Sequence, residues 1–149
     1  MKLVINKCYG GFSVSLDGCR WMAERGHEAA KKEVADYEEE LRTFEHYKTH
    51  GVLPGEWSED TASLRRFRAS MFDISIKYDK LPEFHSGRDF ERHDPLLIAC
   101  VEALGAAHRT GASGSHASLA IVEIPDGVEY VIEEYDGQEW IAEKHRTWS

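Results

Sequence analysis

We predict an α+β fold, with a mostly antiparallel sheet that ends in a C-terminal β-meander and is packed by two to three helices, one of them long and charged. Three observations support this class. Residues 28–48 carry an apolar stripe at helical spacing, residues 118–145 hold short strand patterns separated by turn signals, and an apolar run opens the chain at residues 2–8. The chain therefore orders its elements as a strand, helices, a strand, a helix and three final strands.

The N-terminal region predicts a strand followed by a short helix. Residues 2–8 read as the strand, and Gly10–Gly11 end it. Ser15 is suited to cap a helix over residues 16–25, which Gly26 then ends.

Residues 28–48 give the strongest helix pattern in the chain. Val34, Tyr37, Leu41 and Phe44 recur at steps of three and four, and charged residues fill the remaining positions. This apolar stripe is suited either to packing on the protein's own sheet or to an interface between two subunits.

The central part of the chain is less regular. Residues 61–68 are compatible with a short helix, and residues 71–78 alternate apolar and polar side chains as a half-buried strand does. Asp94 and Pro95 form a cap and first-turn pair, and they open a helix that we expect to end at Gly105.

The C-terminal third predicts the meander. A Gly/Ser-rich loop over residues 106–117 precedes a strand at 118–124, and a Pro-Asp-Gly turn leads to a second strand at 128–135. Asp136–Gly137 is a strong two-residue hairpin signal, so residues 138–145 should return antiparallel to the second strand.

Length and composition limit the class of protein. A chain of 149 residues with no repeat or boundary predicts one domain over residues 1–149. The net charge of −9 disfavours binding to long nucleic acid, although local basic clusters suit a small anion; the acidity is equally compatible with a role in solubility alone. The apolar runs are too short to cross a membrane, there is no signal-peptide pattern, and three cysteines without a close pair suit reduced thiols in the cytoplasm.

The sequence contains no recognisable catalytic or metal-binding motif. The histidines show neither HxxH nor HExxH spacing, and GxSxG, GxxxxGK[ST] and GxGxxG are all missing. We therefore expect no metal, no cofactor and no catalytic residue, and a protein that is not an enzyme.

The glycine pair is the first candidate ligand site. Glycines that follow a strand and precede a helix expose backbone N–H groups suited to an anion, and nearby aromatic rings are suited to stacking on a base. The alternative is an ordinary turn whose aromatic residues belong to the core. The candidate residues are Asn6, Lys7, Tyr9, Gly10, Gly11, Phe12 and Ser13.

The C-terminal segment is the second candidate ligand site. It offers an ammonium, a titratable ring, a guanidinium and an aromatic platform, whereas the alternative is a frayed tail. Its candidate residues are Lys144, His145, Arg146 and Trp148, to which we add Arg109 from the Gly/Ser-rich loop.

Both ends of the chain resemble a widespread family of small phage and prophage proteins. The resemblance rests on INKCYGGFSVS at the start and EIPDGVEYVIEEYDGQEWIAEKHRTW at the end. Small phage proteins of this kind include the Thoeris anti-defence sponges, which bind cyclic ADP-ribose isomers without cleaving them. The resemblance implies a phage protein in the host cytoplasm, but it assigns no binding residue to this chain.

These observations lead to three hypotheses for function. In the first, a homo-oligomer sequesters a nucleotide-derived immune signal, either cyclic ADP-ribose-like or a cyclic oligonucleotide, without cleaving it. In the second, the acidic surface binds a host defence protein or mimics DNA. In the third, the protein is an enzyme that processes a nucleotide or ribosyl group.

Overall fold

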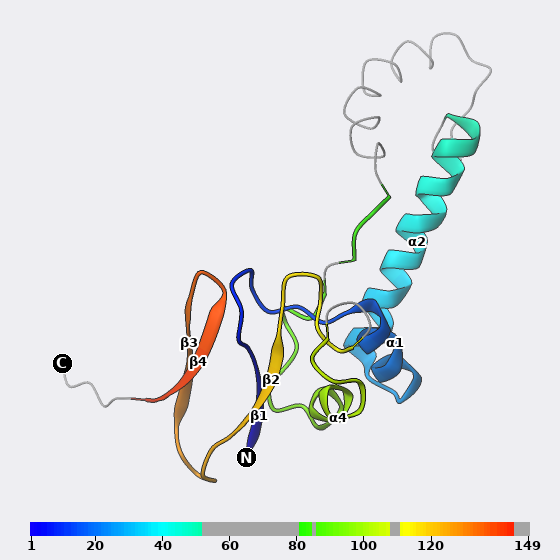
Figure 1. Cartoon of the computed structure of the whole chain (residues 1–149). Coiled ribbons are helices and arrows are strands. Elements are labelled where there is room, and N and C mark those ends of the chain that lie inside the picture. The colour runs from blue at the N-terminus through cyan, green and yellow to red at the C-terminus, as the bar shows by residue number, and fades with distance from the viewer. Residues whose placement is uncertain (52–80, 85, 108–110, 145–149) are drawn as a thin grey trace, which may run out of the picture. The chain divides into compact units, whose positions relative to one another are not determined.

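The computed structural model describes residues 1–51, 81–84, 86–107 and 111–144 (Figure 1). The contacts within the chain group its residues into two compact units. The sequence analysis predicts one domain over residues 1–149. The first unit comprises Met1–Val34 with Phe84–Ser149, and the second comprises Ala35–Glu83. The helix predicted over 61–68 and the strand predicted over 71–78 lie outside the described residues.

A two-stranded antiparallel sheet forms the centre of the first unit. Strand β1 (Lys2–Asn6) pairs with β2 (Leu119–Glu123), with Lys2 opposite Glu123. Val4 belongs to the main hydrophobic core, whereas Leu3 and Ile5 are buried outside that cluster. Because side chains alternate across a strand, β1 is buried on both of its faces.

Two short helices belong to the first unit, both where the sequence predicts them, and the second of them contacts the sheet. Helix α1 (Leu16–Glu24) begins at Ser15, whose Oγ accepts a hydrogen bond from Gly18 N at 2.9 Å. Helix α4 (Pro95–Leu104) begins at Asp94, whose side chain accepts from the first-turn amides. The two helices contact each other, and α4 also contacts β1 and β2, so the apolar faces of both helices form the core with Val4.

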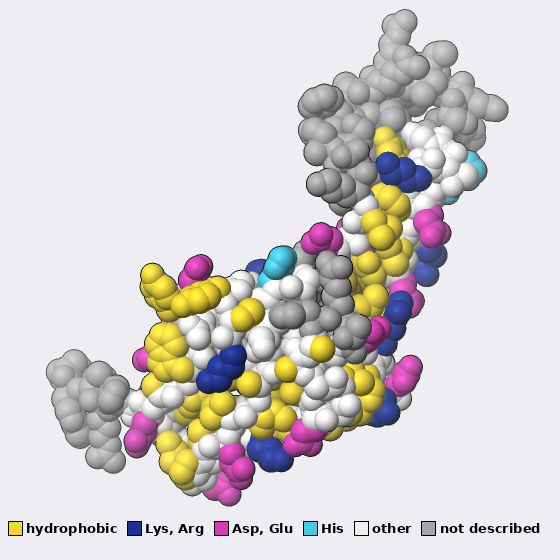
Figure 2. Space-filling view, in the orientation of Figure 1, with side chains coloured by type: hydrophobic (Ala, Val, Ile, Leu, Met, Phe, Trp, Pro, Cys, Tyr) yellow, Lys and Arg dark blue, Asp and Glu magenta, His cyan; other side chains and the backbone are white. Residues whose placement is uncertain are grey.

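The long predicted helix is also present, as α2 (Glu28–His50). In the first unit, Ala30 is fully buried in the core and Val34 packs against it. In the second unit the helix continues with Tyr37, whose hydroxyl donates to the carbonyl of Pro82 at 2.9 Å. Hydrophobic side chains follow one side of α2 and charged side chains the other (Figure 2), which agrees with the stripe in the sequence.

The last two strands form the predicted C-terminal hairpin. Strand β3 (Tyr130–Tyr135) pairs antiparallel with β4 (Gln138–Glu143). The turn residues Asp136 and Gly137 have φ angles of 50° and 89°, as a tight hairpin of this handedness requires.

The α+β class is confirmed, but the meander is shorter than the sequence predicts. Strand β2 pairs with β1 and not with β3, so only β3 and β4 are consecutive neighbours. Because β1 is buried on both faces, its backbone N–H and C=O groups need hydrogen-bond partners, and β2 provides them. Figure 1 shows the resulting arrangement of the first unit, with α1 and α4 on one side of β1–β2 and the hairpin on the other.

Candidate functional site

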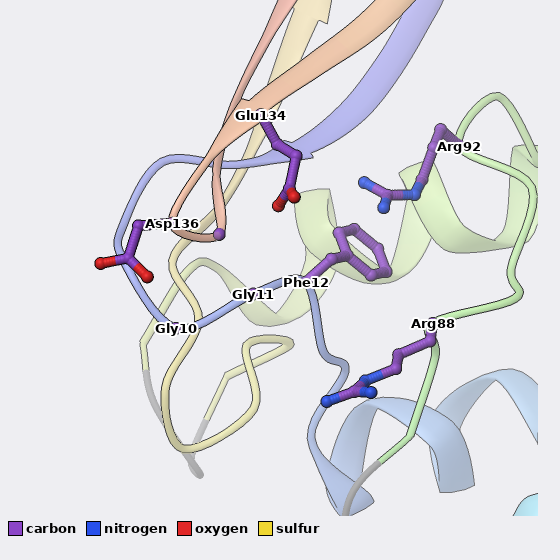
Figure 3. A pocket seen from close by; sticks show the side chains of 8 residues that line it. Gly10, Gly11, Phe12, Arg88, Arg92, Glu134 and Asp136 are labelled. Carbon is purple, nitrogen blue, oxygen red and sulfur yellow. The ribbon is translucent and has the colours of Figure 1, made fainter.

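A hollow lies where the turn of the β3–β4 hairpin meets the loop after β1 (Figure 3). Its volume is about 480 Å³, within the range typical of small-molecule sites. We call it the hairpin hollow. It is lined by residues from three separate parts of the chain, namely Gly10, Gly11, Phe12, Arg88, Arg92, Glu134, Asp136 and Gly137.

The two glycine-containing turns contact each other directly through their backbones. Gly10 N donates to the carbonyl of Asp136 at 3.2 Å. A Cβ placed on Gly137 would overlap the amide nitrogen of Gly11 and would lie 2.7 Å from that of Gly10. Position 137 therefore requires glycine for two reasons: its φ is positive, and the facing loop leaves no room for a Cβ.

Asn6 holds the hairpin turn in place and has no polar atom left for a ligand. Its Nδ2 donates to the carbonyls of Cys8 and Gly137, each at 2.7 Å. Its Oδ1 accepts from the amides of Ser118, at 2.9 Å, and Cys8, at 3.3 Å. The side chain is fully buried, so Asn6, a predicted ligand residue, supports the wall of the hollow.

A buried ion pair joins the hairpin to the rest of the first unit. The guanidinium of Arg92 donates to both carboxylate oxygens of Glu139, with an Nη2–Oε1 distance of 2.8 Å. The same carboxylate accepts from Asn6 N at 3.1 Å. Arg92 also stacks on the ring of Phe12, with its guanidinium carbon 3.5 Å from the ring centroid. The positive charge of Arg92 is therefore largely compensated by groups of the protein itself.

The remaining charged groups divide the hollow into a basic and an acidic side. Within the described residues Arg88 forms no ion pair, and its side chain is exposed. Glu134 and Asp136 are exposed as well. Figure 3 shows the two arginines on one side of Phe12, with Glu134 and Asp136 toward the other.

Three other predicted site residues lie outside this lining. Lys7 and Tyr9 are exposed, the latter by 61%, and neither lines the hollow. The carbonyl of Ser13 accepts from Gly114 N at 3.0 Å, so Ser13 holds the loop that follows α4. The first turn of α1 does not line the hollow either, which removes the helix N-terminus from the site.

The structure does not bring the described part of the second candidate segment to the glycine loop. Lys144 N donates to the carbonyl of Glu129 at 2.9 Å, at the end of the hairpin opposite its turn. At about 3.4 Å per residue, the seven residues from Gly137 to Lys144 carry Lys144 ~24 Å away from the turn. Arg109, His145, Arg146 and Trp148 lie outside the described residues.

Sequence analysis missed the two arginines and the acidic residues of the hollow. Arg88 and Arg92 lie in an irregular segment without periodicity. Glu134, which lines the hollow, and Glu139, which pairs with Arg92, resemble ordinary solvated strand residues in the sequence. The Asp136–Gly137 signal correctly predicted a turn, but no local pattern indicates which loop that turn contacts.

The described residues add two findings on other classes of site. In these segments no three His, Cys, Asp or Glu side chains lie close enough to hold a metal ion. None of the helices in the same segments is long and apolar enough to cross a membrane.

Comparison with protein-family models, with curated proteins and with solved structures found no match.

Proposed function

We propose that this protein binds a small nucleotide-derived anion in the hairpin hollow and sequesters it without cleaving it. One observation carries the proposal: the glycine loop and the C-terminal hairpin, distant in sequence, together line a hollow that contains Arg88, which forms no ion pair with any described residue. The ligand class remains a cyclic ADP-ribose-like molecule or a cyclic oligonucleotide.

The donors in the hollow suit a phosphate group. Arg88 is exposed and forms no ion pair within the described residues, so its guanidinium is available for bidentate hydrogen bonds. Over the same residues, the amides of Gly11 and Phe12 donate to no acceptor. Backbone amides beside an arginine are a common arrangement for phosphate recognition, because they supply directed donors without a mobile side chain.

The biological setting is proposed from the resemblance of both chain ends to small phage proteins. On this view the protein is a phage anti-defence sponge in the host cytoplasm, and it forms a homo-oligomer. The oligomer is proposed because an apolar stripe at helical spacing, like that of residues 28–48, is suited to an interface between two subunits.

Isothermal titration calorimetry tests the proposal. Cyclic ADP-ribose isomers and cyclic di- and trinucleotides would be titrated into the whole chain at protein concentrations well above micromolar. We expect heat from at least one ligand and a loss of about tenfold or more in affinity in Arg88→Gln, since a hydrogen-bonded charge pair is removed. Lys144→Gln is the matched control, because it removes the same charge at the other end of the hairpin. The absence of heat with every ligand would refute the proposal.

Recovery of the ligand separates sequestration from turnover. A saturated complex would be incubated for hours, denatured, and its small-molecule fraction analysed by mass spectrometry. Sequestration predicts the unmodified ligand in stoichiometric amount, whereas a processed product would favour the nucleotide- or ribosyl-processing enzyme.

A second candidate function is binding to a host protein. On the hairpin face that carries Glu133, Trp140 is 42% exposed, and Tyr135 on the same face is 70% exposed. Exposed aromatic side chains are enriched at protein-binding surfaces. This candidate predicts a stoichiometric host partner whose capture is lost in Trp140→Ala and retained in Arg88→Gln; sequestration predicts the reverse dependence for ligand binding.

A further inference from the structure

We propose that Glu134 and Asp136 determine how the ligand is oriented and whether its ribose can carry a phosphate. A phosphate of the ligand lies at Arg88, and the ribose hydroxyls lie at the two carboxylates. This inference rests on the proposed function and narrows its ligand class to the cyclic ADP-ribose-like molecules. A ribose that carries a second phosphate, as in a cyclic oligonucleotide, would be rejected. Arg88 then holds a phosphate group of the ligand, and the two carboxylates hold a ribose whose hydroxyls are free.

The first step is the charge balance of the hollow. Arg92 is neutralised by Glu139, which is 7% exposed and binds both ends of its guanidinium. The charges left for a ligand are therefore one guanidinium, Arg88, and two carboxylates, Glu134 and Asp136. Such a hollow is not suited to a polyanion, which would need cations on every side.

The second step is the placement of the two carboxylates. Glu134 lies directly opposite Glu139 in the β3–β4 ladder, so the two share the hairpin face turned toward Arg92. Asp136 follows Glu134 by two residues and is fixed by the turn, whose carbonyl accepts from Gly10 N. In Figure 3 the carboxylate of Glu134 points into the hollow, and Asp136 lies at its edge beside Gly10 and Gly11.

The third step is the chemistry that ionised carboxylates recognise. A carboxylate only accepts hydrogen bonds, and ribose hydroxyls are donors; acidic residues bind ribose hydroxyls in this way in dinucleotide-binding folds. A phosphate at the same place would meet like charge over a few ångströms, which is strongly unfavourable. The two residues would therefore favour a free ribose and exclude a 2′- or 3′-phosphate.

The test uses three soluble probes, namely 5′-AMP, adenosine 2′,5′-bisphosphate and adenosine 3′,5′-bisphosphate. Each would be titrated by calorimetry into the wild-type chain, into Glu134→Gln/Asp136→Asn and into Glu143→Gln. Asparagine tolerates the positive φ of position 136, so the double variant keeps the turn. Glu143→Gln removes a negative charge from the far end of β4 and controls for the general field of the protein.

We expect the wild-type chain to bind 5′-AMP about tenfold or more tightly than either bisphosphate. The double variant should abolish or invert that preference, and Glu143→Gln should keep it. Equal or tighter binding of a bisphosphate by the wild type, an unchanged preference in the double variant, or no binding of 5′-AMP would each overturn the inference. The proposed function is refuted separately, by the absence of heat with the cyclic ligands.

Discussion

Replacing Glu139 by alanine should destabilise the first unit by about 3 kcal/mol, because it leaves the half-buried guanidinium of Arg92 without its partner. Removing one member of a buried ion pair costs about 3–5 kcal/mol. Glu139 is 7% exposed and Arg92 is 17% exposed, so water reaches the guanidinium in part and the lower end of that range applies. The change also removes the acceptor of Asn6 N, an edge amide of β1.

Urea unfolding followed by circular dichroism measures this effect, with fits that compare both the midpoint and the slope of the transition. Glu143→Ala is the matched control, since Glu143 is exposed on the same strand, and it should stay within about 0.5 kcal/mol of the wild type. A double-mutant cycle with Arg92→Met should give a coupling energy above about 1 kcal/mol. The reasoning fails if Glu139→Ala matches Glu143→Ala, because the ion pair would then contribute nothing to holding the hairpin.

Three further predictions concern the hairpin turn and the cysteines. Gly137→Ala should lower the unfolding free energy by at least about 1 kcal/mol more than Gly127→Ala does in the same urea assay. Both glycines have positive φ, but only a Cβ at position 137 meets the facing loop. Equal losses in the two variants would show that the close contact does not require glycine. Burial raises the pKa of Cys19 to about 12 and that of Cys100 to about 11. In the native protein at pH 8, iodoacetamide should therefore modify only the half-buried Cys8, as counted by mass spectrometry. Modification of either buried thiol at a rate similar to that of Cys8 would contradict this prediction. Because both folded pKa values are raised, their contribution to stability is complete below the ordinary thiol pKa and should be lost as the pH rises toward 11–12.

The predicted elements that formed are those whose signals are local. Ser15 and Asp94 cap helices through amides two or three residues away, and the stripe of α2 repeats within a single segment. The Asp136–Gly137 turn likewise needs only its own backbone angles. Such signals are complete within a short window of sequence, so sequence reasoning found them.

Strand pairing and the hollow depend on contacts between distant residues, and sequence reasoning could not supply these. The partner of β2 is a strand near the other end of the chain, which the meander prediction did not consider. The Arg92–Glu139 pair joins residues 47 positions apart, and neither residue lies in a recognisable motif. The glycine loop contacts the hairpin turn through Gly10 N and the carbonyl of Asp136, whereas Lys144 N donates to the carbonyl of Glu129.

The central claim is that a nucleotide-derived anion binds in the hairpin hollow, and NMR titration of the uniformly ¹⁵N-labelled chain with ADP-ribose tests it most directly. The account predicts saturable amide shifts at Gly10, Gly11 and Asp136, which line the hollow, and an unchanged amide at Lys144. Arg88→Gln should weaken the shifts in parallel at all three positions. Saturable binding that leaves these three amides unmoved, or no shift anywhere at millimolar ligand, would contradict the account.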